Sequence, residues 1–262
     1  MLQTRIVAAL IALPVVAAAI FAGGYWFLGG VLVIGLLNGW EFGQMMQAGG
    51  YRPSRPLLLL LIAALMLDAY IPALRLLGPI LSITLLSSLI WQLFQTDSRA
   101  PTVDWALTVA GGLYIGWGMA HLVALRELNQ GLAWLLLALV SIWAADTMAY
   151  FVGRTFGRRR LWPRHSPKKT WEGLGGGIAG GILGAVGVSL FFPQLGWASA
   201  LIIGAVVPIV GLFGDLAESM MKRHVGVKDS SNLFPGHGGF LDRSDSVLFV
   251  SIVVYYYAIW VG

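Results

Sequence analysis

The sequence has no cysteine and very few charged residues. Among its 262 residues, 11% are Asp, Glu, Lys or Arg and 58% are hydrophobic. The absence of cysteine excludes a disulfide-stapled secreted domain, a thiolate metal site and a cysteine nucleophile. Because soluble proteins carry about 25% charged residues, this chain has too little charge to cover a surface that faces water. We therefore expect an integral membrane protein.

Apolar runs of the length that a helix needs to cross a bilayer, about 20 residues, recur along the chain. We predict an all-α polytopic membrane protein with about nine transmembrane helices, at residues 5–22, 25–44, 57–71, 79–94, 105–125, 131–152, 173–192, 197–213 and 245–261. The third and fourth runs are the shortest. The first run follows Arg5 and resembles a signal peptide, but further apolar runs follow it instead of a soluble domain, so we expect it to be retained.

The Lys and Arg residues predict the orientation of these helices. If the N-terminus is cytoplasmic, 15 of the 17 Lys and Arg residues fall on the cytoplasmic side, and only Arg75 and Arg126 fall outside. Such a bias is typical of cytoplasmic loops. We therefore expect a cytoplasmic N-terminus, an outside C-terminus and a location in the cell inner (plasma) membrane. The net charge of +5 is then explained by the basic cytoplasmic loops of a membrane protein, so we expect no nucleic-acid partner.

Charged residues are concentrated in the second half of the chain. Residues 146–245 hold 18 of the 29 charged residues. We expect residues 1–130 to form an N-terminal scaffold of transmembrane helices. Residues 131–262 would form a catalytic half with two charged cytoplasmic loops, 153–172 and 214–244, so the active site would face the cytoplasm.

The first charged loop mixes hydroxyl groups with cations just before a helix that we expect to begin near Gly173. Its polar candidates are Ser166, Lys168, Lys169 and Thr170. Free N–H groups at a helix start bind phosphate well, and Lys adds a point charge. The simpler alternative is a basic anchor that meets anionic lipid.

Asp146 lies late in an apolar run. A carboxylate at such a depth is costly and is a functional candidate by default. The alternative is a buried partner for a neighbouring helix.

The second charged loop begins with four polar residues that share one helix face. Asp215, Glu218, Ser219 and Lys222 have i, i+3, i+4, i+7 spacing. Carboxylates without cysteine favour a hard cation, Mg²⁺ first, which takes one or two carboxylates and leaves the rest of its shell to substrate phosphates. Asp215 and Asp242, from opposite ends of the loop, are the candidate ligands. The alternative is a set of ion pairs, such as Asp215 with Lys222.

Glycines have two roles in this half of the chain. Residues 235–239 read Pro-Gly-His-Gly-Gly, which predicts a tight turn that brings backbone close to a ligand. Two series spaced by four residues predict close packing of helices, and a phosphate cradle is the less favoured alternative because there is no Walker A motif. The two series are Gly173, Gly177, Gly181 and Gly176, Gly180, Gly184.

The run from Ser219 to Asp245 resembles the signature of the phosphatidate cytidylyltransferases, also called CDP-diacylglycerol synthases. The matching positions are Ser219, Lys222-Arg223, Lys228-Asp229, Ser231, Phe234-Pro235, His237-Gly238-Gly239-Phe240 and Asp242-Arg243. The one departure is Ser244, where the family usually has a hydrophobic residue or Thr. The first charged loop, from Asp146 to Gly173, is also similar, so the resemblance covers about 100 residues.

The resemblance implies that CTP and phosphatidate are converted to CDP-diacylglycerol and pyrophosphate, with Mg²⁺ and with the number of cations left open. It also implies a homodimer. Asp215 and Asp242 would hold the metal, and Lys222 and Arg223 would complete the catalytic set. The substrate-binding candidates are Asp146, Ser166, Lys168, Lys169, Thr170, Glu218, Ser219, Lys228, Asp229, His237, Gly238, Gly239 and Arg243.

Two other classes of function stay open at this point. One is a related CTP-dependent transferase, such as a CDP-archaeol synthase or a polyprenol kinase, the latter releasing CDP instead of pyrophosphate. The other is an ion or lipid transporter whose pathway Asp146 and Asp215 would line. The charges gather at one face and no internal repeat is evident, which argues against a transporter.

Overall fold

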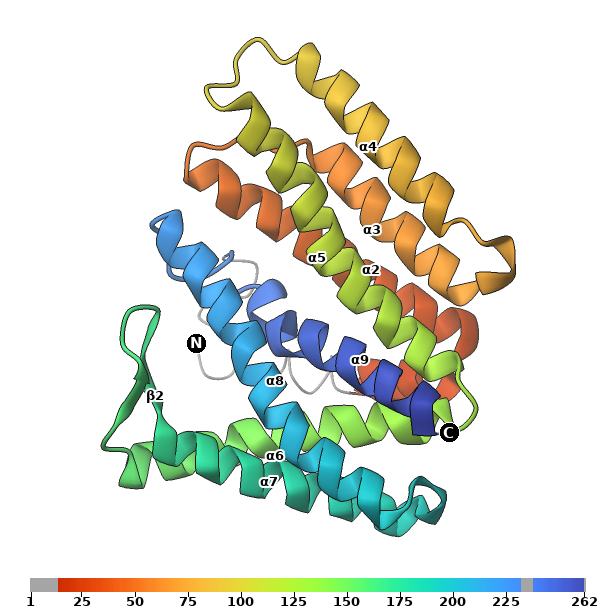
Figure 1. Ribbon diagram of the computed structural model, residues 1–262, viewed down its shortest axis with the longest axis vertical. Coiled ribbons are helices and arrows are strands. Elements are labelled where there is room, and N and C mark those ends of the chain that lie inside the picture. The colour runs from red at the N-terminus through yellow and green to blue at the C-terminus, as the bar shows by residue number, and fades with distance from the viewer. Residues whose placement is uncertain (1–13, 232–237, 262) are drawn as a thin grey trace. The chain divides into compact units, whose positions relative to one another are not determined.

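The computed structural model describes residues 14–231 and 238–261, and most of these residues are helical (Figure 1). After a helical stretch over residues 14–22 come α2 (Gly24–Ala48), α3 (Arg55–Tyr70), α4 (Leu77–Leu93), α5 (Pro101–Glu127), α6 (Gly131–Phe156), α7 (Trp171–Phe191), α8 (Trp197–His224) and α9 (Leu241–Val261). Short 3-10 turns, η1 (Pro72–Leu74) and η2 (Pro193–Leu195), begin at prolines. Two strands, β1 (Arg160–Trp162) and β2 (Ser166–Thr170), complete the list.

Six helices are long and apolar enough to cross a membrane within the part of the chain that the structure describes. They are α2, α5, α6, α7, α8 and α9. The expected helices at 57–71 and 79–94 correspond to α3 and α4. With 16 and 17 residues, these two helices are shorter than the six named above. Residues 5–13 of the first expected helix lie outside the described residues. The protein is therefore a helical, polytopic membrane protein.

Helix α8 is longer than the apolar run that predicted it. It continues beyond residue 213 to His224, so the predicted polar face lies on an unbroken helix. The helix ends two residues before Gly226, whose φ of +76° is a left-handed conformation that favours glycine and stops helix propagation.

The segment 153–172 contains regular structure where the sequence predicted a loop. Strands β1 and β2 pair antiparallel, with Arg160 opposite Thr170. The Thr170 hydroxyl accepts a hydrogen bond from the Gly173 N–H at 3.1 Å and so caps α7, which begins at Trp171. The Glu172 carboxylate accepts hydrogen bonds from the N–H groups of Arg158 and Arg159 at 3.1 and 3.2 Å. These bonds hold the basic segment against the start of α7.

The chain divides into two compact units. Unit 1 comprises residues 1–127 and 224–244, and unit 2 comprises residues 128–223 and 245–262. In unit 1, helices α2, α3 and α5 pack together, and α4 lies against α3 and α5. Their core is apolar, with Leu58, Ile62 and Met66 of α3 fully buried. The first unit is thus a helical bundle that receives a segment from far along the chain.

In unit 2, α6 and α7 lie side by side along most of their length (Figure 1). The predicted glycine packing is confirmed here. A Cβ at Gly180 would lie 2.6 Å from the Ala144 carbonyl oxygen of α6, and one at Gly184 would lie 3.0 Å from that of Val140. A Cβ at Gly181 would instead meet the Gly204 carbonyl oxygen of α8 at 2.5 Å. The small residues therefore let helix backbones approach closely.

This packing predicts a sharp difference between two glycines of α7. Gly180→Ala places a methyl group against backbone and is expected to lower the free energy of unfolding by about 1–3 kcal/mol. A Cβ at Gly187 would have no neighbour within 4 Å among the described residues. Gly187→Ala is therefore expected to be neutral or to stabilise by up to about 1 kcal/mol, because Ala favours helix. Thermal melts of both variants in detergent test this, and equal midpoints would contradict it.

Candidate functional site

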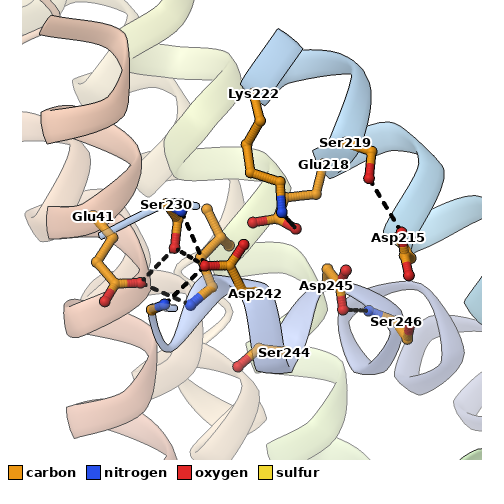
Figure 2. Close-up of polar contacts among 12 residues, drawn as sticks. Glu41, Asp215, Glu218, Ser219, Lys222, Ser230, Asp242, Ser244, Asp245 and Ser246 are labelled. Atoms are coloured by element: carbon orange, nitrogen blue, oxygen red, sulfur yellow. Dashed lines mark hydrogen bonds and ion pairs between the residues drawn. The ribbon is translucent and has the colours of Figure 1, made fainter. Parts of the chain in front are cut away.

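In unit 2, α8 carries the predicted polar face. The Asp215 carboxylate forms an ion pair with Lys169 at 2.7 Å. It also accepts a hydrogen bond from the Ser219 hydroxyl at 3.2 Å (Figure 2). Lys169 comes from β2, so the hairpin brings a cation of the first charged segment to the second. The sequence had suggested Lys222 as an ion-pair partner of Asp215, and the structure gives Asp215 a different one.

Lys222 pairs with Glu218, one turn earlier on α8. The two charged groups are 2.7 Å apart, and Figure 2 shows the Lys222 side chain folded back onto Glu218. Glu218 is 1% exposed, and the side chain of Lys222 is 11% exposed. A buried charge is tolerated when it is paired, because removing one partner leaves the other charge uncompensated.

Asp245, near the start of α9, joins this group. It is 7% exposed, and its Oδ1 accepts a hydrogen bond from the Ser246 N–H at 2.6 Å. A Cβ at Gly214 would lie 2.5 Å from the Asp245 carbonyl oxygen, so a glycine is what lets α8 come close to α9 here. Asp245 interacts electrostatically with Asp215, Lys222 and Lys169. The sequence pattern had not singled out Asp245 as a site residue.

Asp146 of α6 has an exposed side chain and forms no ion pair with the residues that the structure describes, and it is close enough to Lys169 and Asp215 to feel the charge of both. Unit 2 thus brings together four carboxylates and two ammonium groups. The members are Asp146, Asp215, Glu218, Asp245, Lys169 and Lys222. We call them the acidic cluster. It carries two more negative than positive formal charges, which is an arrangement that a bound cation would stabilise.

In unit 1, Asp242 organises the turn that precedes α9. Its Oδ2 accepts hydrogen bonds from the N–H groups of Ser230 and Gly239 at 2.9 and 2.8 Å and from the Ser230 hydroxyl at 2.7 Å (Figure 2). A carboxylate in the first turn of a helix also interacts favourably with the helix dipole. The carboxylate is therefore held in one orientation by backbone.

Glu41 of α2 is a second carboxylate at this turn, and it was not among the residues predicted from the sequence. It is completely buried, and it accepts hydrogen bonds from the backbone N–H groups of Phe240 and Leu241 at 3.0 and 2.8 Å and from the Ser231 hydroxyl at 2.6 Å. The signal in the sequence was a carboxylate within an apolar run, the feature that singled out Asp146.

Gly238 and Gly239 have no room for a side chain. Gly238 has a φ of +77°, and a Cβ there would lie 2.7 Å from Asp242 Oδ2. A Cβ at Gly239 would collide with Ser230 and Glu41. The described part of the predicted turn, Gly238 and Gly239, thus brings backbone close to the carboxylates of Asp242 and Glu41, and residues 235–237 lie outside the described residues.

Two glycines with the same backbone conformation give a matched test of this contact. Gly226 has a φ of +76°, and among the described residues no atom lies within 4 Å of where its Cβ would be. Gly226→Ala and Gly238→Ala both carry the strain of a left-handed residue, about 1–2 kcal/mol, but only the second also crowds Asp242. We expect Gly238→Ala to lower the thermal midpoint further than Gly226→Ala. Equal shifts would mean that the contact with Asp242 contributes nothing.

The remaining predicted site residues are divided between the two units. Arg223 and Lys168 are exposed in unit 2, where Ser166 is half-buried and Thr170 is engaged as a helix cap. Lys228, Asp229 and Arg243 belong to unit 1, at or near its surface. His237 lies outside the described residues.

In the described ranges, 14–231 and 238–261, no three His, Asp or Glu side chains form a preassembled metal cage. The donors in hand nevertheless suit Mg²⁺ chemically. They are carboxylate oxygens, and Mg²⁺ uses only one or two protein carboxylates when substrate phosphates supply further ligands. The excess negative charge of the acidic cluster fits a cation as well.

The chain is similar to known proteins along its full length. A model of the cytidylyltransferase family matches residues 3–261. A phosphatidate cytidylyltransferase of Pseudomonas aeruginosa is 36% identical over 99% of this chain and 97% of its own length. One of Synechocystis is 35% identical over 97% of this chain and 96% of its own. One of Bacillus subtilis is 44% identical, and that match spans 55% of this chain and 54% of the relative.

These matches agree with the resemblance of residues 219–245 and extend it to the N-terminal half, where hydropathy alone had been informative. A match over nearly the whole chain leaves no large segment without a counterpart. The family prediction is confirmed: this chain belongs to the cytidylyltransferase family.

Proposed function

We propose that this membrane protein is a phosphatidate cytidylyltransferase of phospholipid biosynthesis, a nucleotidyltransferase that converts CTP and phosphatidate to CDP-diacylglycerol and pyrophosphate. The observation that carries the proposal is similarity over nearly the full chain to relatives of that name. The acidic cluster and the Asp242 turn supply charged and hydrogen-bonding groups of the kind that phosphate chemistry needs.

The reaction joins two anions, so neutralising their charge and orienting them is the main task of the protein. A phosphate oxygen of phosphatidate attacks the α-phosphorus of CTP and forms a new P–O–P linkage. The bond between the α-phosphorus and the oxygen that bridges the α- and β-phosphates breaks, and pyrophosphate leaves. The nucleophile is already anionic, so no strong general base is required. Lys222, Arg223, Lys228 and Arg243 are proposed to neutralise phosphate oxygens, and Lys168 and Lys169 are proposed to bind the triphosphate or the lipid head group.

Mg²⁺ is proposed as the cofactor, held by Asp215 and Asp242. The cation would supply charge neutralisation and orientation of phosphate groups. Three hydrogen bonds from Ser230 and Gly239 hold the Asp242 carboxylate in one orientation, which supports its proposed role as a metal ligand. Asp215 supports the same role because two further carboxylates, Asp146 and Asp245, lie near it, and their negative charge favours a bound cation.

The proposal includes the topology. Residues 1–130 would be a scaffold and residues 131–262 the catalytic half, with about nine transmembrane helices in all. The N-terminus would be cytoplasmic and the C-terminus outside, so that the head group of phosphatidate meets cytosolic CTP at the inner membrane of a bacterial cell. The acyl chains would stay in the bilayer. A homodimer is part of the proposal.

The test is pyrophosphate release by the purified protein with CTP, phosphatidate and Mg²⁺. We expect release that depends on the lipid and stops when EDTA removes the metal. Asp242→Asn is expected to abolish it. CDP without pyrophosphate would instead indicate a lipid kinase. A folded protein that forms neither product with several lipids would contradict an enzymatic role and favour transport.

A further inference from the structure

A second polar site lies entirely within unit 1. A cavity of about 730 Å³ is formed where the connection between α2 and α3 meets the connection between α4 and α5. Three arginines line it, Arg52, Arg55 and Arg99, and the other polar side chains of its lining include Gln47, Ser54 and Gln95. None of the residues proposed for the cytidylyl transfer lines this cavity.

The lining of the cavity carries a net positive charge. Asp97 is the one carboxylate among the described residues that line it, against three guanidinium groups. Asp97 pairs with Arg52 at 3.5 Å, but both side chains are exposed, at 83% and 62%. Exposed pairs of this kind contribute little free energy. An incoming dianion can therefore replace Asp97 as the partner of Arg52.

Two buried polar atoms behind the wall of this cavity have no hydrogen-bond partner among the residues that the structure describes. They are the Ser54 hydroxyl and Arg55 Nε. Ser54 is 6% exposed and stands at the N-cap position of α3, yet its side chain does not cap the helix. A buried donor without a partner is costly. In the first turn of α3, Pro56 has no N–H and the Leu58 N–H donates to the Ser54 carbonyl oxygen, which leaves the N–H groups of Arg55 and Leu57 without helical partners.

The walls of the cavity are held in place by hydrogen bonds to α5. The carboxylate of Asp104, 2% exposed, accepts hydrogen bonds from the Arg52 N–H at 2.7 Å and from the Ser98 hydroxyl at 2.5 Å, which ties the two connections together. The Ser54 N–H donates to the Thr108 hydroxyl at 2.8 Å. The Arg55 guanidinium lies 4.7 Å from the centre of the Trp40 ring. The donors are thus positioned before any ligand arrives.

We propose that this cavity binds a phosphate group, carried either by an anionic lipid or by a nucleotide, at a site separate from the reaction. Arginine matches phosphate geometry because its planar guanidinium donates two parallel hydrogen bonds. The uncapped start of α3 adds N–H donors of the kind that bind phosphate. The proposal does not depend on the proposed cytidylyl transfer.

The test is hydrogen–deuterium exchange of the full chain in phosphatidylcholine nanodiscs with EDTA present, so that no turnover occurs. Phosphatidate in the nanodisc is one probe and CTP in solution is the other. We expect at least one probe to protect the peptides that cover residues 49–58 and 94–100. Protection by phosphatidate alone identifies the lipid as the source of the phosphate, and protection by CTP alone identifies the nucleotide.

Single substitutions locate the effect. Arg52 and Arg99 are exposed, so replacing them does not disturb the core. Arg52→Gln and Arg99→Gln are each expected to raise the probe concentration needed for half-maximal protection by at least about tenfold. The reason is that each substitution removes charge-assisted hydrogen bonds to the phosphate. Arg75→Gln removes the same charge from an exposed position of unit 1 outside the cavity and is expected to leave binding unchanged. Absence of protection by both probes, or an equal loss in Arg75→Gln, would overturn the proposal.

Discussion

Asp215→Asn is expected to lower pyrophosphate release by at least about 10³-fold while leaving the protein as stable as before, or more stable. The activity falls because a proposed metal ligand loses its charge, and a catalytic cation contributes several kcal/mol to transition-state stabilisation. Stability does not fall because Asp215 interacts with two other carboxylates, Asp146 and Asp245. Neutral Asn relieves that repulsion, and this offsets the lost ion pair with Lys169.

Activity and thermal midpoint, measured on the same preparation, separate this outcome from a structural role. Asp68→Asn is the matched control. The Asp68 carboxylate accepts a hydrogen bond from the Leu76 N–H through Oδ1, and an Asn amide oxygen can keep that bond. The control therefore removes one negative charge from a helix end and is expected to retain activity. A lower midpoint together with modest loss of activity in Asp215→Asn would show that Asp215 acts structurally.

Glu41→Gln is expected to have the largest effect on stability, a loss of about 3 kcal/mol in the free energy of unfolding. Each carboxylate oxygen of Glu41 accepts a hydrogen bond from a backbone N–H, Oε1 from Phe240 and Oε2 from Leu241. Gln replaces one of these oxygens with an NH₂ group, which cannot accept. One backbone N–H then faces another donor in a fully buried site. An unsatisfied buried donor costs about 1–3 kcal/mol, and the other bonds lose their charge assistance.

The effect is expected to reach the proposed reaction, since the same turn carries Gly239 and Asp242. Pyrophosphate release would therefore fall together with the thermal midpoint. Glu127→Gln makes the identical chemical change at an exposed position of unit 1 and is expected to leave both quantities unchanged. If Glu41→Gln melts like the wild type, the buried carboxylate does not hold the turn.

The helical, membrane-embedded character of the protein follows from the sequence alone, because it depends on composition and on local periodicity. The four-residue glycine series and the polar face from Asp215 to Lys222 were also readable, since residues that share a helix face are close in sequence. The family was readable from residues 219–245, where fixed spacings carry the resemblance. Each of these features is encoded within one segment of the chain.

The partners of the polar residues were decided only by the tertiary structure. Ser231 and Glu41 are 190 residues apart in the chain, and no local pattern links them. Likewise, Asp215 meets Lys169 because the hairpin of β1 and β2 leads to the start of α7, and Asp245 joins them because Gly214 lets two helices approach. The sequence determined which segments are helical and where charge is concentrated. Which charges meet depends on how the helices pack, because contacts between distant segments are set by shape and close approach and not by spacing along the chain.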